Sequence, residues 1–299
     1  MMASEQTGGI DLHIHSNASD GTCSPGEIVR MAVDKGLRAI AITDHDTLDG
    51  SRSVLAMPLP DHLEFMTGVE ISTAAPAGFQ MDGSLHILGY GVDLDNAPLE
   101  QTLADLQHAR DERIPRIVAL LNRAGISITM AEVTALVGDG SAGRPHVARV
   151  LIQSGAATDV NDAFDRYLAK GQPAYVEKRR VDCRVAIELI LGAGGIPVLA
   201  HPYLVPGGRT DALRGLLGPL CDMGLMGIEA YYSRHTPEDV ALYLDFARRF
   251  DLLVTGGTDF HGDLITDIQM GTGQGDLLVP YALYEVLSSK IEQQKQKAV

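Results

Sequence analysis

Three short segments of this chain place histidine and aspartate side chains close together. In two of them the paired residues are two positions apart, so on an extended strand their side chains project from the same face. Imidazole and carboxylate groups in combination are typical ligands of divalent transition metals. The residues are His13, His15, Asp20, His45, Asp259 and His261.

Three more residues of the same types occur in or directly after segments that read as strands. Glu70 closes the predicted strand 65–70, His86 lies within 85–90, and His201 follows 196–200. Together they bring the candidate ligands to nine, and centres with more than one metal need about that many, with one carboxylate bridging. Glu70 is our candidate bridge. This ligand mix suits Mn²⁺, Zn²⁺ or Fe²⁺ better than Mg²⁺ or Ca²⁺.

A single pair of histidines on a strand is weak evidence for a metal site. The prediction depends on the coincidence that nearly all nine residues fall at the predicted carboxyl ends of strands, where barrel enzymes place their chemistry. Asp44 and Asp46 flank His45, and they can instead be carboxylates that orient imidazoles.

The elements that must position these residues begin with the segment 10–15. Its alternation predicts a strand with Ile10, Leu12 and Ile14 facing a helix layer and the histidines facing the barrel interior. Ser24-Pro25-Gly26-Glu27 then has the spacing of a capping box, with proline at the first helical position. The next strand is expected at 39–43. This strand–helix–strand unit predicts parallel pairing.

The rest of the chain repeats the pattern of short strands and amphipathic helices. Such alternation predicts an α/β barrel or a doubly wound sheet. Further strands are expected at 65–70, 85–90, 196–200, 227–230 and 252–255, and helices near 183–193, 211–223, 237–250 and 280–294.

The pattern changes between residue 95 and about residue 176, where we find no segment with a clean period of two. We interpret this stretch as a helical subdomain inserted between two barrel strands. It should cover the strand ends, because barrel loops grow there. Its predicted helices are 99–124, 130–137, 145–154 and 160–170.

Composition limits the classes of function. The 299 residues include 39 acidic and 24 basic side chains, for a net charge of −15. That charge argues against binding long nucleic acid, which needs a basic face, but it allows a small anionic substrate because bound metals dominate the local field. No signal peptide or membrane span is apparent, and three scattered cysteines predict a reducing, cytoplasmic location.

Several segments together resemble the PHP (polymerase and histidinol phosphatase) family. They read DLHIHSNASDGTCSP, TDHDT, GVEIS, HILGYG, AHP and GTDFH. The resemblance implies a distorted seven-stranded (β/α) barrel, at 1–95 and 176–299, that binds up to three metals, with residues 96–175 as the inserted helical subdomain. It implies three ligand sets, namely His13, His15, Glu70 and Asp259; Glu70, His86 and His201; and Asp20, His45 and His261.

Within that family, the segments GRPH and IEAYYSRH resemble the branch that removes the 3′-phosphate of nucleoside 3′,5′-bisphosphates, such as adenosine 3′,5′-bisphosphate. In that interpretation a metal-activated water is the nucleophile, and the metal is Mn²⁺, with Zn²⁺ or Fe²⁺ as alternatives. A metal-bound water, His201 and His235 are the candidate acids for the leaving group. The candidate substrate contacts are Arg144, His146, Tyr232, Arg234 and His235. For the basic run 178–180 we weigh two positions, facing the substrate or in a solvated hinge, and we expect the hinge.

Three alternatives remain open at this point. Relatives in the same branch trim short RNA from the 5′ end, so a 5′-to-3′ exonuclease acting on short oligonucleotides is the second hypothesis. A histidinol-phosphatase-like or amidohydrolase-type hydrolase is the third, although the latter leaves Asp20, His45 and Glu70 unexplained. A binding module without catalysis would be expected to have lost ligands, and all nine are present.

Overall fold

The computed structural model describes residues 9–79, 85–137, 142–205 and 211–297. Its centre is one sheet in which seven strands follow the order β1-β2-β3-β4-β6-β7-β8, while the short β5 pairs with β3. The expected α/β class is confirmed, and every strand expected from the sequence is present. The strands are β1 (Ile10–Ile14), β2 (Ala39–Ile42), β3 (Glu64–Ala74), β4 (Leu85–Tyr90), β5 (Val181–Asp182), β6 (Ile196–Leu199), β7 (Gly227–Tyr232) and β8 (Leu253–Gly257).

The sheet nearly closes into a barrel because β8 and the residues after it return to β1. The backbone N–H of Asp259 donates to the carbonyl of His13 at 2.8 Å, and that of His15 donates to Phe260 at 2.9 Å. Gly257 permits this approach, since a Cβ atom there would lie 2.3 Å from the backbone nitrogen of His13. The expected distorted barrel is therefore confirmed, with a glycine at its seam.

One strand of the barrel runs against its neighbours. β4 pairs antiparallel with both β3 and β6, whereas the pairs β1–β2, β2–β3, β6–β7 and β7–β8 are parallel. The start of β4 therefore lies at the same end of the barrel as the carboxyl ends of the other strands. His86, the second residue of β4, is directly opposite Ser72 of β3. This reversal brings His86 to the end of the barrel where the other candidate ligands lie.

The simple alternation expected along β1 is wrong. The pairing of β1 with β2 shifts register between Asp11 and Ile14, as at a β-bulge. Because a bulge adds one residue, it changes which face the following side chains occupy. Leu12 accordingly packs in one apolar cluster with α10 (Tyr281–Lys297), while Ile14 packs in another with α1 (Pro25–Asp34). Asp11 bonds to Thr258 instead of lying with the histidines.

Helices surround the sheet, and the predicted cap of the first one is confirmed. The side chain of Ser24 accepts from the backbone N–H of Glu27, and Glu27 accepts in return from the N–H of Ser24. The barrel helices are α1 (Pro25–Asp34), α2 (Asp49–Leu55), α7 (Cys183–Gly192), α8 (Asp211–Asp222), α9 (Pro237–Phe250) and α10 (Tyr281–Lys297), with short 3₁₀ turns η2 (Pro202–Leu204) and η3 (Gly262–Leu264).

Sequence reasoning missed α2. This helix is short and polar, and its N-cap, Leu48, provides no side-chain hydrogen bond, so the usual start signal is absent. Gly50 within it is required by close packing, because a Cβ atom there would lie 2.0 Å from Oδ2 of Asp44.

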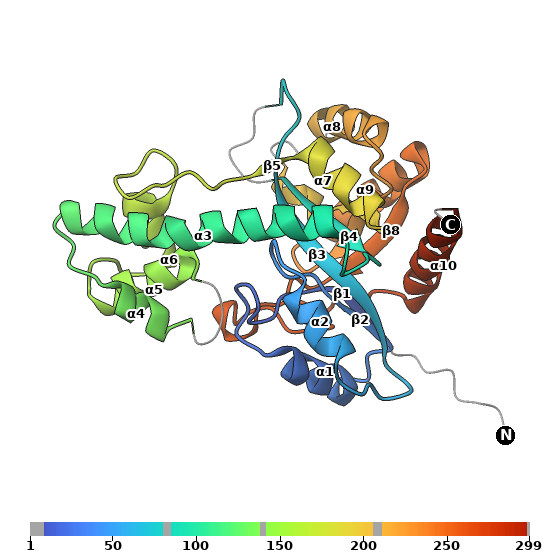
Figure 1. Cartoon of the computed structure of the whole chain (residues 1–299), viewed down its shortest axis with the longest axis horizontal. Coiled ribbons are helices and arrows are strands. Elements are labelled where there is room, and N and C mark those ends of the chain that lie inside the picture. The colour runs from blue at the N-terminus through green and yellow to red at the C-terminus, as the bar shows by residue number, and fades with distance from the viewer. Residues whose placement is uncertain (1–8, 80–84, 138–141, 206–210, 298–299) are drawn as a thin grey trace.

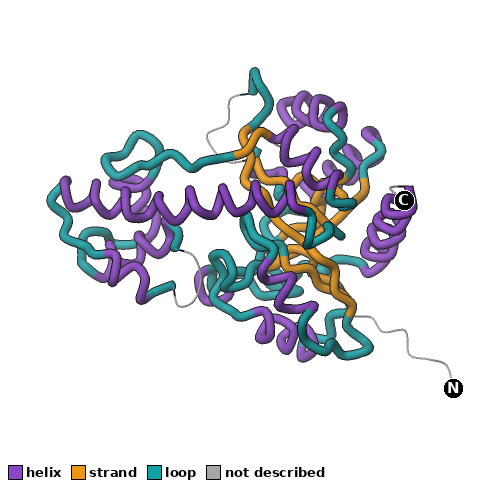
Figure 2. The backbone as a smooth tube through the Cα atoms, in the orientation of Figure 1, coloured by secondary structure: helices purple, strands orange, loops and turns teal. Residues whose placement is uncertain are grey.

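The helices between β4 and β5 extend to one side of the sheet, and α10 lies at the opposite end (Figure 1; Figure 2). They have an apolar cluster of their own, which includes Ile117, Val147 and Leu168. The start of α3 packs instead on the barrel through Leu99 and Leu103. These elements are α3 (Ala97–Arg123), α4 (Met130–Ala135), α5 (Arg144–Gln153), α6 (Val160–Ala163) and the π-helical turn η1 (Phe164–Leu168). No helix in the described ranges is long and apolar enough to span a membrane.

Candidate metal centre and substrate pocket

The structure brings the nine predicted ligand side chains together at one end of the barrel, with Glu70 in the middle. One oxygen of Glu70, Oε1, lies 2.7 Å from Nδ1 of His86 and 2.9 Å from Nε2 of His201. The other, Oε2, lies 3.1 Å from both Nε2 of His15 and Nδ1 of His45. Nε2 of His13 is also 3.4 Å from Oε2, and a carboxylate that contacts five imidazoles through both oxygens is placed as a bridging ligand would be.

Two further aspartates complete the cluster from opposite ends of the sequence. Oδ1 of Asp259 lies 3.1 Å from Nε2 of His15 and 3.4 Å from Nε2 of His13. Oδ1 of Asp20 lies 3.5 Å from Nε2 of His261. Residues from the first and last strands therefore share one cluster because β8 closes on β1.

Ligand atoms within 4.8 Å of one another form three groups. One is the set His13, His15, Glu70 and Asp259 expected from the sequence. The other two differ from the expected sets. His15 joins the group that contains Asp20, and His45 replaces His201 in the group that contains Glu70 and His86, although His201 also lies 2.9 Å from Glu70. Those two groups are His15, Asp20, His45 and His261, and His45, Glu70 and His86.

These residues fit divalent cations. Nδ1 of His15 and Nε2 of His86 are buried without a hydrogen-bond partner, and the contacts of His45 Nδ1 with Glu70 and of Asp20 Oδ1 with His261 lack hydrogen-bond geometry. Leaving such atoms unsatisfied costs free energy, so orphaned donor atoms of metal-binding types indicate that a cation satisfies them. The described backbone is also left-handed at two ligand positions, with φ of 24° at His201 and 57° at Asp259, as is common at functional sites.

Charge distribution keeps several of these groups in the form that binds metal. Burial alone would raise the pKa of Glu70, but positive charge placed at its ring neighbours His45, His86 and His13 outweighs burial and holds that pKa well below the usual value; bound cations would act in the same direction. Burial lowers the pKa values of His45 and His86, whereas at His13, His15 and His201 the neighbouring carboxylates outweigh burial and raise the pKa. Ionised carboxylates and neutral imidazoles are the ligand forms that metal binding requires.

Glu229 supports the cluster from behind and was missed at the sequence level. This fully buried carboxylate lies 2.9 Å from Nδ1 of His13 and accepts from the backbone N–H of His201 at 2.7 Å. A carboxylate on Nδ1 leaves Nε2 of His13 facing Glu70 and Asp259, which is the arrangement of a metal-binding imidazole. The sequence did carry a signal for Glu229, because a charged residue inside an otherwise apolar strand usually has a buried polar partner.

The side chains predicted to contact substrate do not all line one pocket, although the rings of Tyr232 and His235 lie 5.1 Å apart. Tyr232 is buried, and its hydroxyl donates to Asp259 at 2.8 Å. Nδ1 of His235 lies 2.9 Å from the carbonyl oxygen of Ala230. Nδ1 of His146 accepts from the N–H of Gly143 and so caps a helix.

Arg234 has 42% of its side chain exposed and lies 3.5 Å from Asp267. Only Arg144, among the residues predicted to contact substrate, lines the pocket described next.

A pocket of about 350 Å³ adjoins the ligand cluster. Three candidate ligands line one part of it, and basic side chains line another. Phe164 of η1 and Leu204 give it an apolar surface, and π-helical turns often mark functional sites. The ligands are Asp20, His45 and His86, and the basic residues are Arg110, Arg113, Arg144 and Lys178.

One arginine of this pocket, Arg110, pairs with Asp46 at 3.3 Å, but the other two bond to backbone carbonyls. Nε of Arg113 donates to the carbonyl of Val176, and Arg144 donates to that of Leu168. Within the described residues neither guanidinium lies within 4.0 Å of a carboxylate. Uncompensated cations in a partly buried pocket are suited to an anionic ligand.

Two of the four basic pocket residues could have been found from the sequence, and the prediction made for a third was wrong. Arg110 and Arg113 are three positions apart on a helix and so share a face. Lys178 was expected in a solvated hinge, but it is partly buried and donates to the hydroxyl of Ser72.

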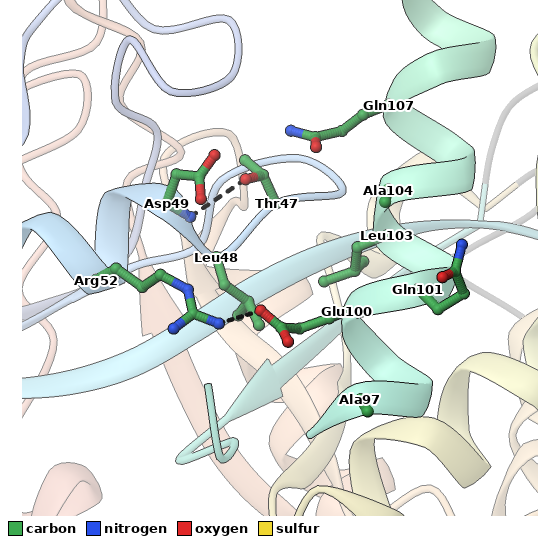
Figure 3. A pocket seen from close by; sticks show the side chains of 10 residues that line it. All are labelled: Thr47, Leu48, Asp49, Arg52, Ala97, Glu100, Gln101, Leu103, Ala104 and Gln107. Atoms are coloured by element: carbon green, nitrogen blue, oxygen red, sulfur yellow. Dashed lines mark hydrogen bonds and ion pairs between the residues drawn. The ribbon is translucent and has the colours of Figure 1, made fainter. Parts of the chain in front are cut away.

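A second pocket, of about 420 Å³, lies between α2 and α3 (Figure 3). Arg52 pairs there with Glu100 and, at 2.9 Å, with Asp95, which ties α2 to the start of α3. The described residues that line it include none of the nine candidate ligands. This pocket therefore has a structural ion pair but no cluster able to perform the chemistry described above.

The fold and this cluster define an α/β barrel with metal-binding geometry at the carboxyl ends of its strands. Residues 11–177 match the family described as the PHP domain. A 5′-3′ exoribonuclease from Haemophilus influenzae is 35% identical over 254 residues, covering 84% of this chain and 89% of that protein.

A 3′,5′-nucleoside bisphosphate phosphatase from Chromobacterium violaceum is 32% identical over 253 residues, covering 84% and 87% of the two chains. A structure from Bifidobacterium adolescentis assigned as a metal-dependent phosphoesterase superposes with a TM-score of 0.80 at 29% identity, over 95% of this chain and 96% of that one. The chain belongs to the PHP domain family, as its sequence motifs predicted.

Proposed function

We propose that this protein is a metal-dependent phosphatase that removes the 3′-phosphate of nucleoside 3′,5′-bisphosphates. Adenosine 3′,5′-bisphosphate would yield AMP and inorganic phosphate. The observation that carries the proposal is the pocket of about 350 Å³, which has His45 and His86 on one part of its wall and Arg113 and Arg144 on another. A substrate with two phosphates can place one at each, and the 32% identical bisphosphate phosphatase supports this choice.

The nine side chains would hold the metal ions at the barrel end, with Glu70 shared between them. The proposed ligands are His13, His15, Asp20, His45, Glu70, His86, His201, Asp259 and His261. Bound divalent cations supply hydroxide from water at neutral pH and stabilise charge on phosphoryl oxygens. Mn²⁺ is our proposed metal, with Zn²⁺ or Fe²⁺ as alternatives that accept the same ligands.

The second phosphate would be held by Arg113 and Arg144. Both guanidinium groups are at least partly buried, and planar guanidinium groups form paired hydrogen bonds to phosphate oxygens. Arg144 is also the first residue of α5, whose N-terminus favours an anion. Phe164 offers a ring for the nucleoside to pack on.

We further propose that residues 96–175 act as a cap that supplies this second phosphate site to the barrel at 1–95 and 176–299. Both arginines and Phe164 belong to that stretch, and its apolar cluster is separate from those of the barrel. A cytoplasmic location is part of the same proposal, because nucleotide substrates are found there.

The second candidate is a 5′-to-3′ exonuclease acting on short RNA. The 35% identical exoribonuclease favours it, and the same arginines would then hold a 5′-phosphate while the cluster acts on the next phosphodiester. The net charge of −15 restricts this activity to short strands.

The test compares phosphate release from adenosine 3′,5′-bisphosphate, 3′-AMP and 5′-AMP with Mn²⁺ added, together with the digestion of a five-nucleotide RNA. Preferred release of the 3′-phosphate from the bisphosphate supports the phosphatase. Mononucleotide production from the RNA, with no phosphate released from the bisphosphate, would replace it with the exonuclease.

A further inference from the structure

Cleavage of a phosphate ester leaves an alkoxide that must gain a proton, so the site needs a proton donor. Within the part of the chain that the structure describes, the titratable groups lining the pocket are of three kinds. Asp20, His45 and His86 are candidate ligands. Guanidinium groups do not release protons in proteins. The remaining group is the ammonium of Lys178.

Neither histidine predicted from the sequence is better placed for this role. Nε2 of His201 lies 2.9 Å from Glu70, within the ligand cluster. His235 is not among the described residues that line the pocket, and its ring packs against Tyr232 and Tyr243, with centroid distances of 5.1 Å and 4.7 Å.

The position of Lys178 is fixed by its contact with β3. Its ammonium donates to the hydroxyl of Ser72, which also lies 3.2 Å from Oδ2 of Asp46. Ser72 is directly opposite His86 in the β3–β4 pair. The ammonium therefore shares one pocket with the candidate ligands and with the arginines that would hold the second phosphate.

We propose that Lys178 is a catalytic residue that donates a proton to the leaving 3′-oxygen of the substrate. This inference rests on the proposed phosphatase function and adds its acid. Hydroxide from water attacks phosphorus, the P–O3′ bond breaks, and its electron pair passes to O3′. That oxygen takes one proton from the ammonium of Lys178. The products are inorganic phosphate and the nucleoside 5′-monophosphate, and the neutral amine regains a proton from solvent.

The surroundings of Lys178 are compatible with proton donation near neutral pH. Burial and the neighbouring Arg110 of α3 lower its pKa to about 8, against the opposing effect of Asp46, Asp20 and Glu70. A catalytic acid is most effective when its pKa lies near the working pH.

The test uses Lys178→Met and Lys178→Arg in the full chain loaded with Mn²⁺. Each is assayed on adenosine 3′,5′-bisphosphate and on its analogue with sulfur as the 3′ bridging atom. A thiolate leaves without needing a proton, so the analogue does not require the acid. Lys170→Met, an exposed lysine nearby, is the matched control.

We expect Lys178→Met to lose about 100-fold or more in kcat on the oxygen substrate, in the range of general-acid contributions, and less than about threefold on the sulfur analogue. Lys178→Arg should not restore activity on the oxygen substrate, because arginine keeps the charge but not the proton donation. Metal content by elemental analysis should match wild type in both variants.

Three other results would overturn the proposal. Equal losses on both substrates with rescue by arginine would make Lys178 only an electrostatic contact. A loss of bound metal would make its role structural. A wild-type enzyme that releases no phosphate from the bisphosphate would overturn the proposed function itself, and this is measured independently of any variant.

Discussion

Glu229 provides a sharp test of how the metal cluster is held in place. It makes two contacts with cluster residues, with Nδ1 of His13 at 2.9 Å and with the backbone N–H of His201 at 2.7 Å. In Glu229→Gln, one amide oxygen can accept from the His201 N–H while the NH₂ group must face His13. That NH₂ favours the His13 tautomer with its proton on Nε2.

A protonated Nε2 cannot bind a metal, and Nε2 is the atom that faces Asp259 and Glu70. Loss of a supporting carboxylate of this kind typically costs about 10- to 100-fold in metal affinity or activity. That range corresponds to about 1.4 to 2.8 kcal/mol of binding free energy. We therefore expect the Kd for Mn²⁺ to rise by this factor in Glu229→Gln.

The assay titrates Mn²⁺ into chelator-stripped protein in competition with a metal-binding dye. Glu188→Gln, an exposed glutamate of α7, is the matched control and should bind as wild type does. A folded Glu229→Gln protein with a Kd within twofold of wild type would refute the reasoning, because the contact with Glu229 would then not determine how His13 binds metal.

Three further predictions follow from the pocket and the barrel seam. Arg144→Met should raise KM for adenosine 3′,5′-bisphosphate about 10- to 100-fold, because one charge-assisted contact is lost, and should leave KM for 3′-AMP unchanged. Equal effects on both substrates would contradict the proposed second-phosphate site. Activity on the bisphosphate should fall as the pH rises through about 8, because Lys178 loses its proton above its lowered pKa. A pH profile of kcat that does not fall on the alkaline side would contradict the role of Lys178 as the acid. Gly257→Ala should lower the free energy of unfolding by about 1 to 3 kcal/mol in urea, since its Cβ would meet His13, whereas Gly192→Ala, with open space around it, should not.

The candidate ligands could be predicted from the sequence because most of them are polar residues at or near the ends of apolar strands, and parallel strands bring such ends together. Glu70, for example, closes the predicted strand 65–70, and the structure places it at the centre of the cluster. The capping box at Ser24 was equally readable, because its signal is local.

Features that depend on distant pairing could not be predicted. The bulge in β1 follows from its register with β2, and the reversal of β4 follows from its antiparallel pairing with β3 and β6. The role of Lys178 depends on its contact with Ser72, 106 positions away in the sequence. No local pattern encodes such a contact, so a basic run reads as solvated until the fold is known.

The central claim is that this cluster of imidazoles and carboxylates binds the cations that hydrolysis requires. A crystal grown with Mn²⁺, with data collected at the manganese absorption edge, tests it most directly. We predict anomalous difference peaks beside Glu70, within about 2.5 Å of nitrogen and oxygen atoms of the cluster. A crystal without such peaks, from protein whose phosphatase activity survives complete removal of metal, would contradict the account.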